Sequence, residues 1–199
     1  DEDPQGKTHI VMAWLLGQSN DLDTALEAQL LAGILLDNSA SPLLHALETS
    51  SLGSSPSPMC GLEDSMREMV FACGLEGSDP EQMTAVEDLI LSTLQRLIDE
   101  GVDAGQVESV LHQIELQQRE ISGDSYPYGL QLILNALGSA THRGDPVSAL
   151  NLDPALARLR QKIAQPSYIT GLLQQLIDNP HRVTLIFSPD AQYQQRAEQ

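Results

Sequence analysis

Basic residues, cysteines, aromatic residues and long hydrophobic runs are all scarce in this sequence. Ten lysines and arginines stand against 28 aspartates and glutamates, which gives a net charge of −18. A chain without a basic stripe lacks the charge that binds phosphate backbones or anionic lipids. We therefore expect neither a nucleic acid nor a membrane as a partner. The acidity either keeps the protein soluble or attracts basic peptides.

The two cysteines, Cys60 and Cys73, are too few for a disulfide scaffold. This favours a reducing, intracellular setting. Because the two do not form a C-x-x-C pair, we interpret them as core or loop residues and not as redox groups. Among the few aromatic residues, Trp14 and Phe71 are interpreted as core residues. The longest apolar runs, VMAWLLG and LLAGILL, are far shorter than the roughly 20 residues of a membrane helix.

What the chain does contain is enough apolar sequence for one folded domain. Hydrophobic residues make up 41% of the 199 residues, which predicts a globular protein with a sizeable core. We place a single domain at residues 8–190. The polar stretches 1–7 and 191–199 are interpreted as linkers, and both ends are expected to continue into a longer protein.

Hydrophobic periodicity and turn signals predict an α+β fold. We expect a mostly antiparallel sheet of about four strands, covered on one side by about six helices. The strands are predicted at 8–17, 67–77 and 181–190, and the segment SSPSPMCGLED is irregular or a short strand. The helices are predicted at 21–38, from 41 to about 53, and at 79–101, 103–121, 127–141, from 153 to about 163, and 167–179.

Residues with short polar side chains precede several of these helices. Ser41, Asp79, Asp103 and Ser167 each stand where a side-chain oxygen would accept a hydrogen bond from the first turn. The spacing therefore predicts that these four residues are N-caps. Val107, Val110, Leu111, Ile114 and Ile121 are predicted to form the buried stripe of the helix at 103–121.

The segment 41–53, SPLLHALETSSLG, contains the most suggestive pattern in the chain. His45 and Glu48 are spaced as in the zinc motif H-x-x-E-H, but Thr49 stands in place of the second histidine. A Ser41/His45/Glu48 cluster would share one helix, so the serine is not on the strained turn that acyl transfer usually needs. The remaining histidines are scattered singly along the chain, with no local ligand pair. We therefore interpret the segment as a structural helix and predict no catalytic residue and no metal ligand in this chain.

Five segments in order carry a resemblance to a known family: KTHIVMAWLLG, DLDTALEAQLLAGILLDNSASPLLHALETSSLG, FACGLEG, RGDPVSAL and LIDNPHRVTLIFSPD. Each motif alone is weak, but their order and spacing over about residues 7–190 are specific. The chain resembles the pitrilysin/insulinase metallopeptidases, and within them the presequence-protease branch.

The resemblance implies a place in a larger enzyme. Members of this family have four homologous α+β domains in two halves, which close around an unfolded peptide. Zinc is held in the first domain by H-x-x-E-H, on the helix after the first strand. This chain resembles the second domain, which lacks that motif, and here His45 and Glu48 lie on the following helix. The resemblance thus implies zinc in the parent enzyme but outside this chain.

The implied function follows from that position. We expect a non-catalytic domain that packs on the preceding zinc-binding domain and on the C-terminal half of the same chain. There it would form part of the chamber for unfolded peptides. The alternative is a catalytically inactive structural or assembly subunit of the same fold. The family occurs in bacteria and organelles, so we expect the bacterial cytoplasm, with an organelle matrix as the alternative.

One loop is a candidate for contact with the chamber. Asn38, Ser39, Ala40 and Ser41 stand where related domains carry a glycine-rich or small-residue loop. Small side chains leave room for a substrate backbone, so we predict substrate-chamber contact at these four positions. The competing interpretation is a plain connection between two helices, which short loops of this kind usually are.

Overall fold

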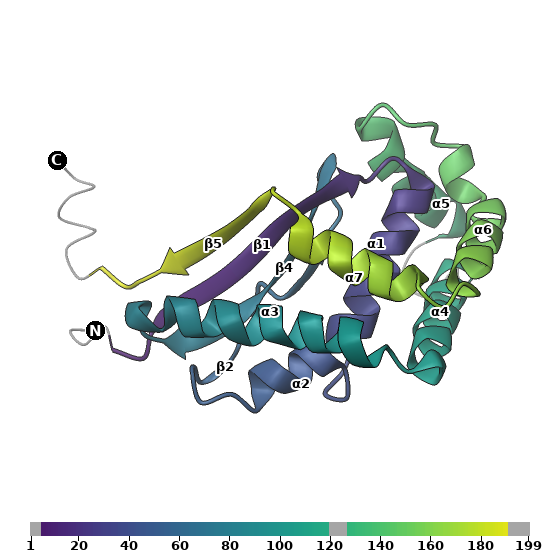
Figure 1. Cartoon of the computed structure of the whole chain (residues 1–199). Coiled ribbons are helices and arrows are strands. Elements are labelled where there is room, and N and C mark those ends of the chain that lie inside the picture. Colours follow the sequence, from purple (N-terminus) through teal and green to yellow (C-terminus); the bar gives the residue numbers. More distant parts are fainter. Residues whose placement is uncertain (1–4, 120–126, 191–199) are drawn as a thin grey trace, which may run out of the picture.

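The sheet of this protein is built around two long, central strands. The structure is a computed structural model that describes residues 5–119 and 127–190. Within them the sheet has five strands, paired antiparallel in the order β2-β4-β1-β5, with β3 also paired to β4 (Figure 1). The strands are β1 (Thr8–Gln18), β2 (Ser55–Pro56), β3 (Gly61–Glu63), β4 (Glu68–Ser78) and β5 (Arg182–Phe187).

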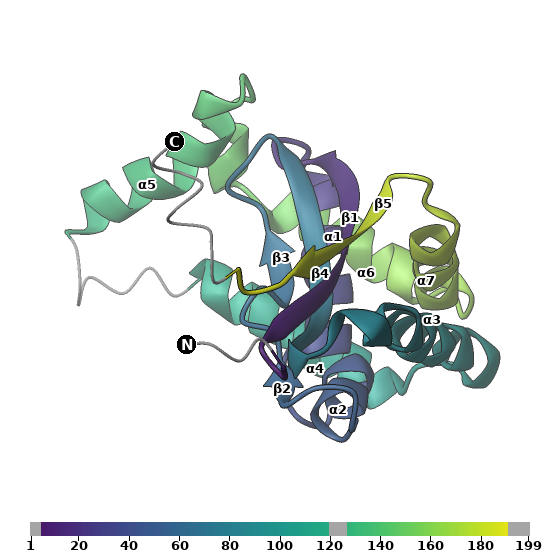
Figure 2. The ribbon, with the colours of Figure 1, turned by 90° about the vertical axis from the view of Figure 1, so that its left-hand side faces the viewer.

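A layer of helices packs on one face of this sheet. α1, α3 and α7 contact the strands or one another, while α2, α4 and α6 pack on the outside of α1 and α3. α5 stands apart from this layer, beyond the β3 side of the sheet (Figure 2). The helices are α1 (Leu22–Leu36), α2 (Pro42–Glu48), α3 (Met83–Glu100), α4 (Ala104–Arg119), α5 (Tyr128–Thr141), α6 (Asp153–Ile163) and α7 (Tyr168–Asp178), with 3-10 turns η1 (Pro80–Gln82) and η2 (Ser148–Leu150).

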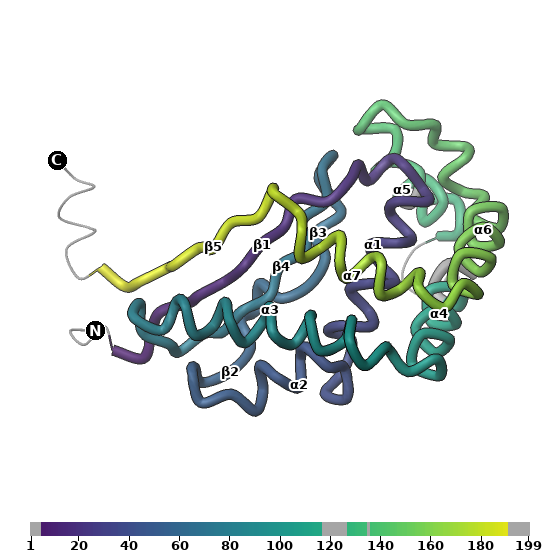
Figure 3. The backbone as a smooth tube through the Cα atoms, viewed as in Figure 1, coloured from purple at the N-terminus to yellow at the C-terminus, as the bar shows by residue number. Residues whose placement is uncertain are grey.

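The predicted α+β class with an antiparallel sheet is therefore confirmed. The described chain has one strand more than expected, and its seven helices fall in the seven predicted ranges, although the expected total was about six. The extra strand comes from SSPSPMCGLED, which supplies both β2 and β3. These strands are two and three residues long, too short for an alternating pattern to reveal them. The first and last strands, far apart in sequence, lie side by side in the backbone trace (Figure 3).

The inner face of β1 and β4 forms the floor of the core. Trp14 and Phe71 are register partners, are 0% and 1% exposed, and place their ring centroids 5.9 Å apart. Cys73 pairs with Met12 on the same face and is also fully buried. The interpretation of Trp14 and Phe71 as core residues is thus confirmed, and Cys73, which was expected in the core or in a loop, lies in the core. The stripe predicted on α4 is buried from Val107 to Ile114, and its last member, Ile121, lies outside the described residues.

The two central strands approach each other closely at Gly74. Val11 is the register partner of this glycine. A Cβ atom on Gly74 would lie 2.0 Å from the carbonyl oxygen of Ile10 and 2.7 Å from the Cα of Val11. Both are backbone atoms of a central strand, so neither yields without moving the sheet. Glycine at this position therefore sets how tightly β4 packs against β1.

Polar contacts fasten α6 and α7 to the outside of α1. The Glu27 carboxylate of α1 accepts from Lys162 Nζ at 2.5 Å and from the Tyr168 hydroxyl at 2.7 Å. Arg158 of α6 makes a charge-assisted pair with Asp23 at 3.0 Å. Exposed ion pairs contribute little individually, but the half-buried Glu27 joins three helices through one carboxylate.

The four predicted N-cap residues stand at helix starts, but only one of them makes the expected hydrogen bond through its side chain. Asp103 Oδ1 accepts from Gln106 N at 3.0 Å, so this cap is confirmed. Ser41, Asp79 and Ser167 stand at helix starts but make no capping hydrogen bond through the side chain. Asp79 Oδ1 instead accepts from Gly6 N at 2.9 Å. The sequence pattern located the helix starts correctly, but other backbone groups compete for the side chains.

Replacement of Gly74 by alanine is expected to destabilise the domain by about 3 kcal/mol, because the new Cβ atom overlaps the backbone of β1. The matched control is Gly171→Ala in α7, where a Cβ atom meets nothing within 4 Å. That change is expected to stabilise by about 0.5–1 kcal/mol, since alanine favours a helix interior. Urea unfolding measures both, and equal free energies for the two variants would contradict the close approach.

The Glu27 contacts predict a loss of stability at alkaline pH. Burial and the hydrogen bond to Glu27 raise the pKa of Tyr168, and the hydrogen bond to Glu27 also raises the pKa of Lys162. Both groups hold their protons more tightly in the folded than in the unfolded chain. Their contribution to the free energy of unfolding is therefore complete below about pH 10. It is lost as the pH rises through the raised pKa values of the folded state.

We expect Tyr168→Phe to make the fall in unfolding free energy between about pH 8 and about pH 11 shallower than in the wild type. Urea unfolding at the two pH values measures this slope. Tyr128→Phe is the matched control, because Tyr128 is 59% exposed on α5, a helix apart from the α1 layer. It should keep the wild-type slope. An unchanged slope in Tyr168→Phe would show that this hydroxyl does not contribute.

Candidate functional site

The loop between α1 and α2 contains the four residues predicted to contact a substrate chamber. Asn38, Ser39 and Ala40 are exposed. Ser41 is 0% exposed, and its hydroxyl accepts from Asn38 N at 3.3 Å and lies 3.5 Å from the carbonyl oxygen of Gly33. The Ser39 hydroxyl donates to Glu48 at 3.1 Å. The loop is thus an ordered turn with three exposed side chains, and the buried Ser41 hydroxyl stabilises it by hydrogen bonds to the backbone.

The zinc-like pattern on α2 lies on the helix surface. His45 and Glu48 are exposed, and Glu48 is engaged by Ser39. Thr49, in the place of the second histidine of the motif, donates its hydroxyl to the carbonyl oxygen of His45 at 2.8 Å. Ser41 turns inward to the backbone of α1. The structure therefore does not bring Ser41, His45 and Glu48 together as a catalytic cluster.

Zinc is also a poor fit to the rest of the described chain. Among residues 5–119 and 127–190, no group of three or more histidine, cysteine or acidic side chains is arranged to hold a metal ion. His142 contacts the carbonyl oxygen of Ser65 through Nε2 at 2.8 Å, far from the exposed His45 on α2. A structural or catalytic zinc site needs three or four such ligands around one point.

The two cysteines are free, and neither is poised as a nucleophile. Burial raises the pKa of Cys73 well above its ordinary value and raises that of Cys60 as well. Cys60 Sγ accepts from Gly74 N at 3.3 Å, so it is fixed beside the central strand. The thiolate is the reactive form, and a raised pKa disfavours it. The cysteines therefore pack as small apolar residues.

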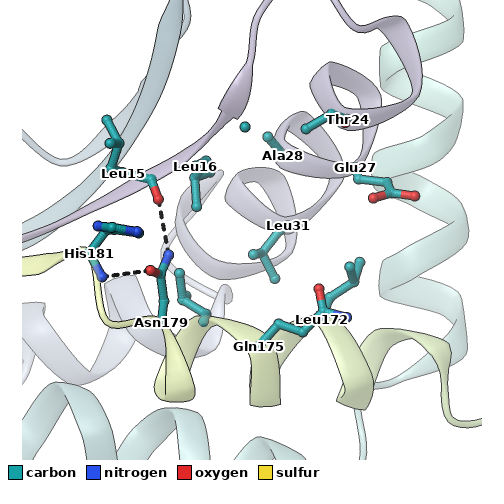
Figure 4. Close-up of a pocket in the computed structure, with 12 residues that line it drawn as sticks. Leu15, Leu16, Thr24, Glu27, Ala28, Leu31, Leu172, Gln175, Asn179 and His181 are labelled. Atoms are coloured by element: carbon teal, nitrogen blue, oxygen red, sulfur yellow. Dashed lines mark hydrogen bonds between the residues drawn. The ribbon is translucent and has the colours of Figure 1, made fainter.

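The cleft in Figure 4 lies where β1, α1 and α7 meet. Its volume is about 280 Å³, and its floor is apolar, from Leu16, Leu31 and Leu172 among others. Asn179 closes one side, donating from Nδ2 to the carbonyl oxygen of Leu15 at 3.0 Å and accepting from His181 N at 2.8 Å (Figure 4). These bonds fix the turn from α7 into β5.

The cleft can hold an apolar side chain but offers no evident chemistry. Glu27 lines the opposite side and is already paired with Lys162 and Tyr168. The amide of Asn179 is likewise occupied by backbone groups. Sequence reasoning missed this cleft, because its walls come from three segments that are remote in the chain. The only signal was the Asn-Pro-His sequence at its edge.

The sheet has a second feature suited to binding. β5 stands last in the strand order, so one of its edges has no strand partner among the described residues. Val183, Ile186 and Phe187 on this strand are 41–50% exposed. An open edge with exposed apolar side chains can accept a further extended chain.

In the described part of the chain, no helix is both long enough and apolar enough to cross a membrane.

Comparison with known proteins identifies a family of peptidase domains. Residues 1–114 match the family described as "Peptidase M16 inactive domain". A mitochondrial presequence protease from Xenopus laevis is 30% identical over 199 residues, which is 99% of this chain and 19% of that protein. Presequence protease 1 of Arabidopsis thaliana, chloroplastic and mitochondrial, is 34% identical over 96% of this chain and 18% of its own length. The chain thus spans about a fifth of these relatives.

The fold has close counterparts among solved structures. A candidate zinc protease from Bordetella pertussis Tohama I superposes with a TM-score of 0.68, over 94% of this chain and 97% of that one. Its sequence is 19% identical, so this likeness concerns the fold alone. The family match covers more than half of the chain, and the presequence-protease relatives cover nearly all of it. This chain belongs to the peptidase M16 family, as one of its inactive domains.

Proposed function

We propose that this chain is the non-catalytic domain of a zinc-dependent metalloendopeptidase that degrades unfolded oligopeptides. The observation that carries the proposal is the match to an inactive peptidase domain, together with presequence proteases that align over nearly the whole chain. In this role the domain packs on the preceding zinc-binding domain and on the C-terminal half of the same protein. It contributes part of the chamber that encloses the substrate.

The geometry supports a binding role and not a chemical one. His45 and Glu48 are exposed, and residues 5–119 and 127–190 offer them no further ligands, so the zinc of the parent enzyme would be held outside this chain. What the domain offers is surface: an apolar cleft, an open edge on β5 and a turn of small residues. An unfolded peptide can extend along such an edge and pair with it as a further strand.

The chamber contact that we propose for the α1–α2 loop concerns its exposed residues first. Asn38, Ser39 and Ala40 are exposed, so a peptide backbone could reach them. Ser41 contributes indirectly, because its buried hydroxyl holds the turn. We therefore propose direct contact for the three exposed residues and a supporting role for the buried Ser41.

The proposed compartment is the interior of a cell or organelle. The names of the relatives mention mitochondria and chloroplasts, and the free cysteines suit a reducing space. The bacterial cytoplasm remains our first expectation and an organelle matrix the second.

The competing proposal is an inactive structural or assembly subunit of the same fold. The presequence proteases that align with this chain weigh against it, because their names denote proteases. The two proposals differ in whether the full-length parent cleaves peptides.

We expect the purified full-length parent to cleave unfolded peptides, to lose this activity in a chelator and to regain it with zinc. The 199-residue chain alone should not cleave them under any of these conditions. Peptide hydrolysis followed by mass spectrometry measures both. A parent that stays inactive with zinc bound would favour the structural subunit. Cleavage by the isolated chain would contradict the absence of a catalytic site in it.

The loop proposal has its own test in the full-length parent. Ala40→Trp places a bulky side chain on the exposed turn, and it should lower kcat/KM for long peptides more than for short ones. Ser92→Trp is the matched control, because Ser92 is also exposed but lies on α3. Equal effects of the two variants would show that the turn does not face the substrate.

A further inference from the structure

The helix α5 has a composition that does not match its surroundings. From Pro127 to Thr141 the sequence PYGLQLILNALGSAT contains no charged residue, in a chain with a net charge of −18. Five large apolar side chains of this helix are between 41% and 63% exposed: Tyr128, Leu130, Ile133, Leu134 and Leu137. A helix that is apolar on most of its circumference is normally buried. Here it stands outside the core.

The position of α5 is fixed at one end by polar contacts. Asn20 donates from Nδ2 to the carbonyl oxygen of His142, just after the helix, at 2.9 Å. His142 Nε2 in turn lies 2.8 Å from the carbonyl oxygen of Ser65. Beyond this end the helix packs chiefly on η2, and Figure 2 shows it apart from the α1, α3 and α7 layer. Its apolar side chains therefore do not contribute to the core of this domain.

An exposed apolar surface of this kind marks an interaction site. The isolated exposed leucines found on most proteins need no partner, but here five occur on one short helix. The hydrophobic effect favours covering such a surface at about 25 cal/mol for each Å² of apolar area removed from water. The absence of charge on α5 means that burial incurs no desolvation penalty for ionised groups.

We propose that α5 is the element through which this domain docks on another domain of its own parent chain. The inference rests on the proposed function, and it names the contact surface that this function requires. The chain spans 18–19% of the length of the presequence proteases that it matches. In a parent of that size, most of the protein lies outside this chain and is available to cover α5.

Charge argues against a second copy of the chain as the occupant. Two chains would bring two net charges of −18 together around a small neutral patch, and such self-repulsion opposes association. A peptide substrate is also disfavoured, because it would leave the apolar helix exposed whenever the enzyme is empty. A resident domain covers the helix at all times and so fits the composition best.

The test compares the accessibility of α5 in the 199-residue chain and in the full-length parent. Ile133→Cys places a thiol on the most exposed large side chain of the helix, and Met59→Cys is the matched control on the loop before β3. Each variant is treated with a thiol reagent, and the label is read by mass spectrometry of the peptide containing the new cysteine. Unmodified chains give the background from native cysteines such as Cys60.

We expect labelling at Ile133→Cys to be slowed more than about tenfold in the parent, because the interface must open before the reagent reaches the thiol. Labelling at Met59→Cys should change little. Equal rates at Ile133→Cys in chain and parent, or equal slowing at both positions, would overturn the proposal. Two further results would also overturn it. Labelling that is slowed only when unfolded peptide is added would indicate a substrate as the occupant. Labelling of the isolated chain that slows as the chain concentration rises would indicate a second copy.

This measurement is independent of peptide cleavage. A parent without peptidase activity would remove the proposed function, yet protection of Ile133→Cys in that parent would still establish the docking role of α5. Conversely, an active parent with a freely labelled α5 would leave the proposed function intact and remove only this inference.

Discussion

The close antiparallel pairing of β1 and β4 is the constraint on which the rest of the structure depends. Gly74 lets the two backbones approach where any side chain would strike the carbonyl oxygen of Ile10. That approach brings Trp14 and Phe71 together on the inner face. The helices α1, α3 and α7 then pack on this face, and β5 adds to the outer edge of β1. Each candidate binding feature is a consequence of this arrangement.

The described residues leave several surfaces suited to binding, among them a cleft, a strand edge and an exposed helix. The cleft at the end of β1 exists because α7 turns into β5 through Asn179 and leaves a gap beside α1. The edge of β5 is open among the described residues, because β5 stands last in their strand order. The helix α5 is anchored at one end through His142 and stands apart from the helix layer.

Local sequence signals predicted most of the fold, because alternation and helical periodicity reflect burial directly. The long strands and all the helices were found, whereas β2 and β3 were too short to show a period. Three of the four predicted N-caps stand at the helix start without a capping bond through the side chain, and for two of them the structure shows the competing partner. Asp79 is taken by Gly6, and the hydroxyl of Ser41 bonds to the turn that precedes it.

The candidate surfaces were harder to predict than the fold. The sequence predicted a helix at 127–141, but periodicity does not reveal whether its apolar residues enter the core. The cleft combines segments around Leu15, Leu31 and Leu172, which only tertiary contacts bring together. The expected position of the domain in a larger enzyme came from the resemblance to a peptidase family. Periodicity, capping and composition carry no information about that position.

Zinc stoichiometry tests the central claim most directly. The 199-residue chain and its full-length parent would be purified with added zinc, dialysed and analysed by plasma mass spectrometry. We predict almost no zinc on the chain and about one ion on each parent molecule, because a zinc site needs three or four ligands around one point. About one tightly bound zinc on the isolated chain would mean that His45 and Glu48 find further ligands, and it would contradict the assignment of this domain as non-catalytic.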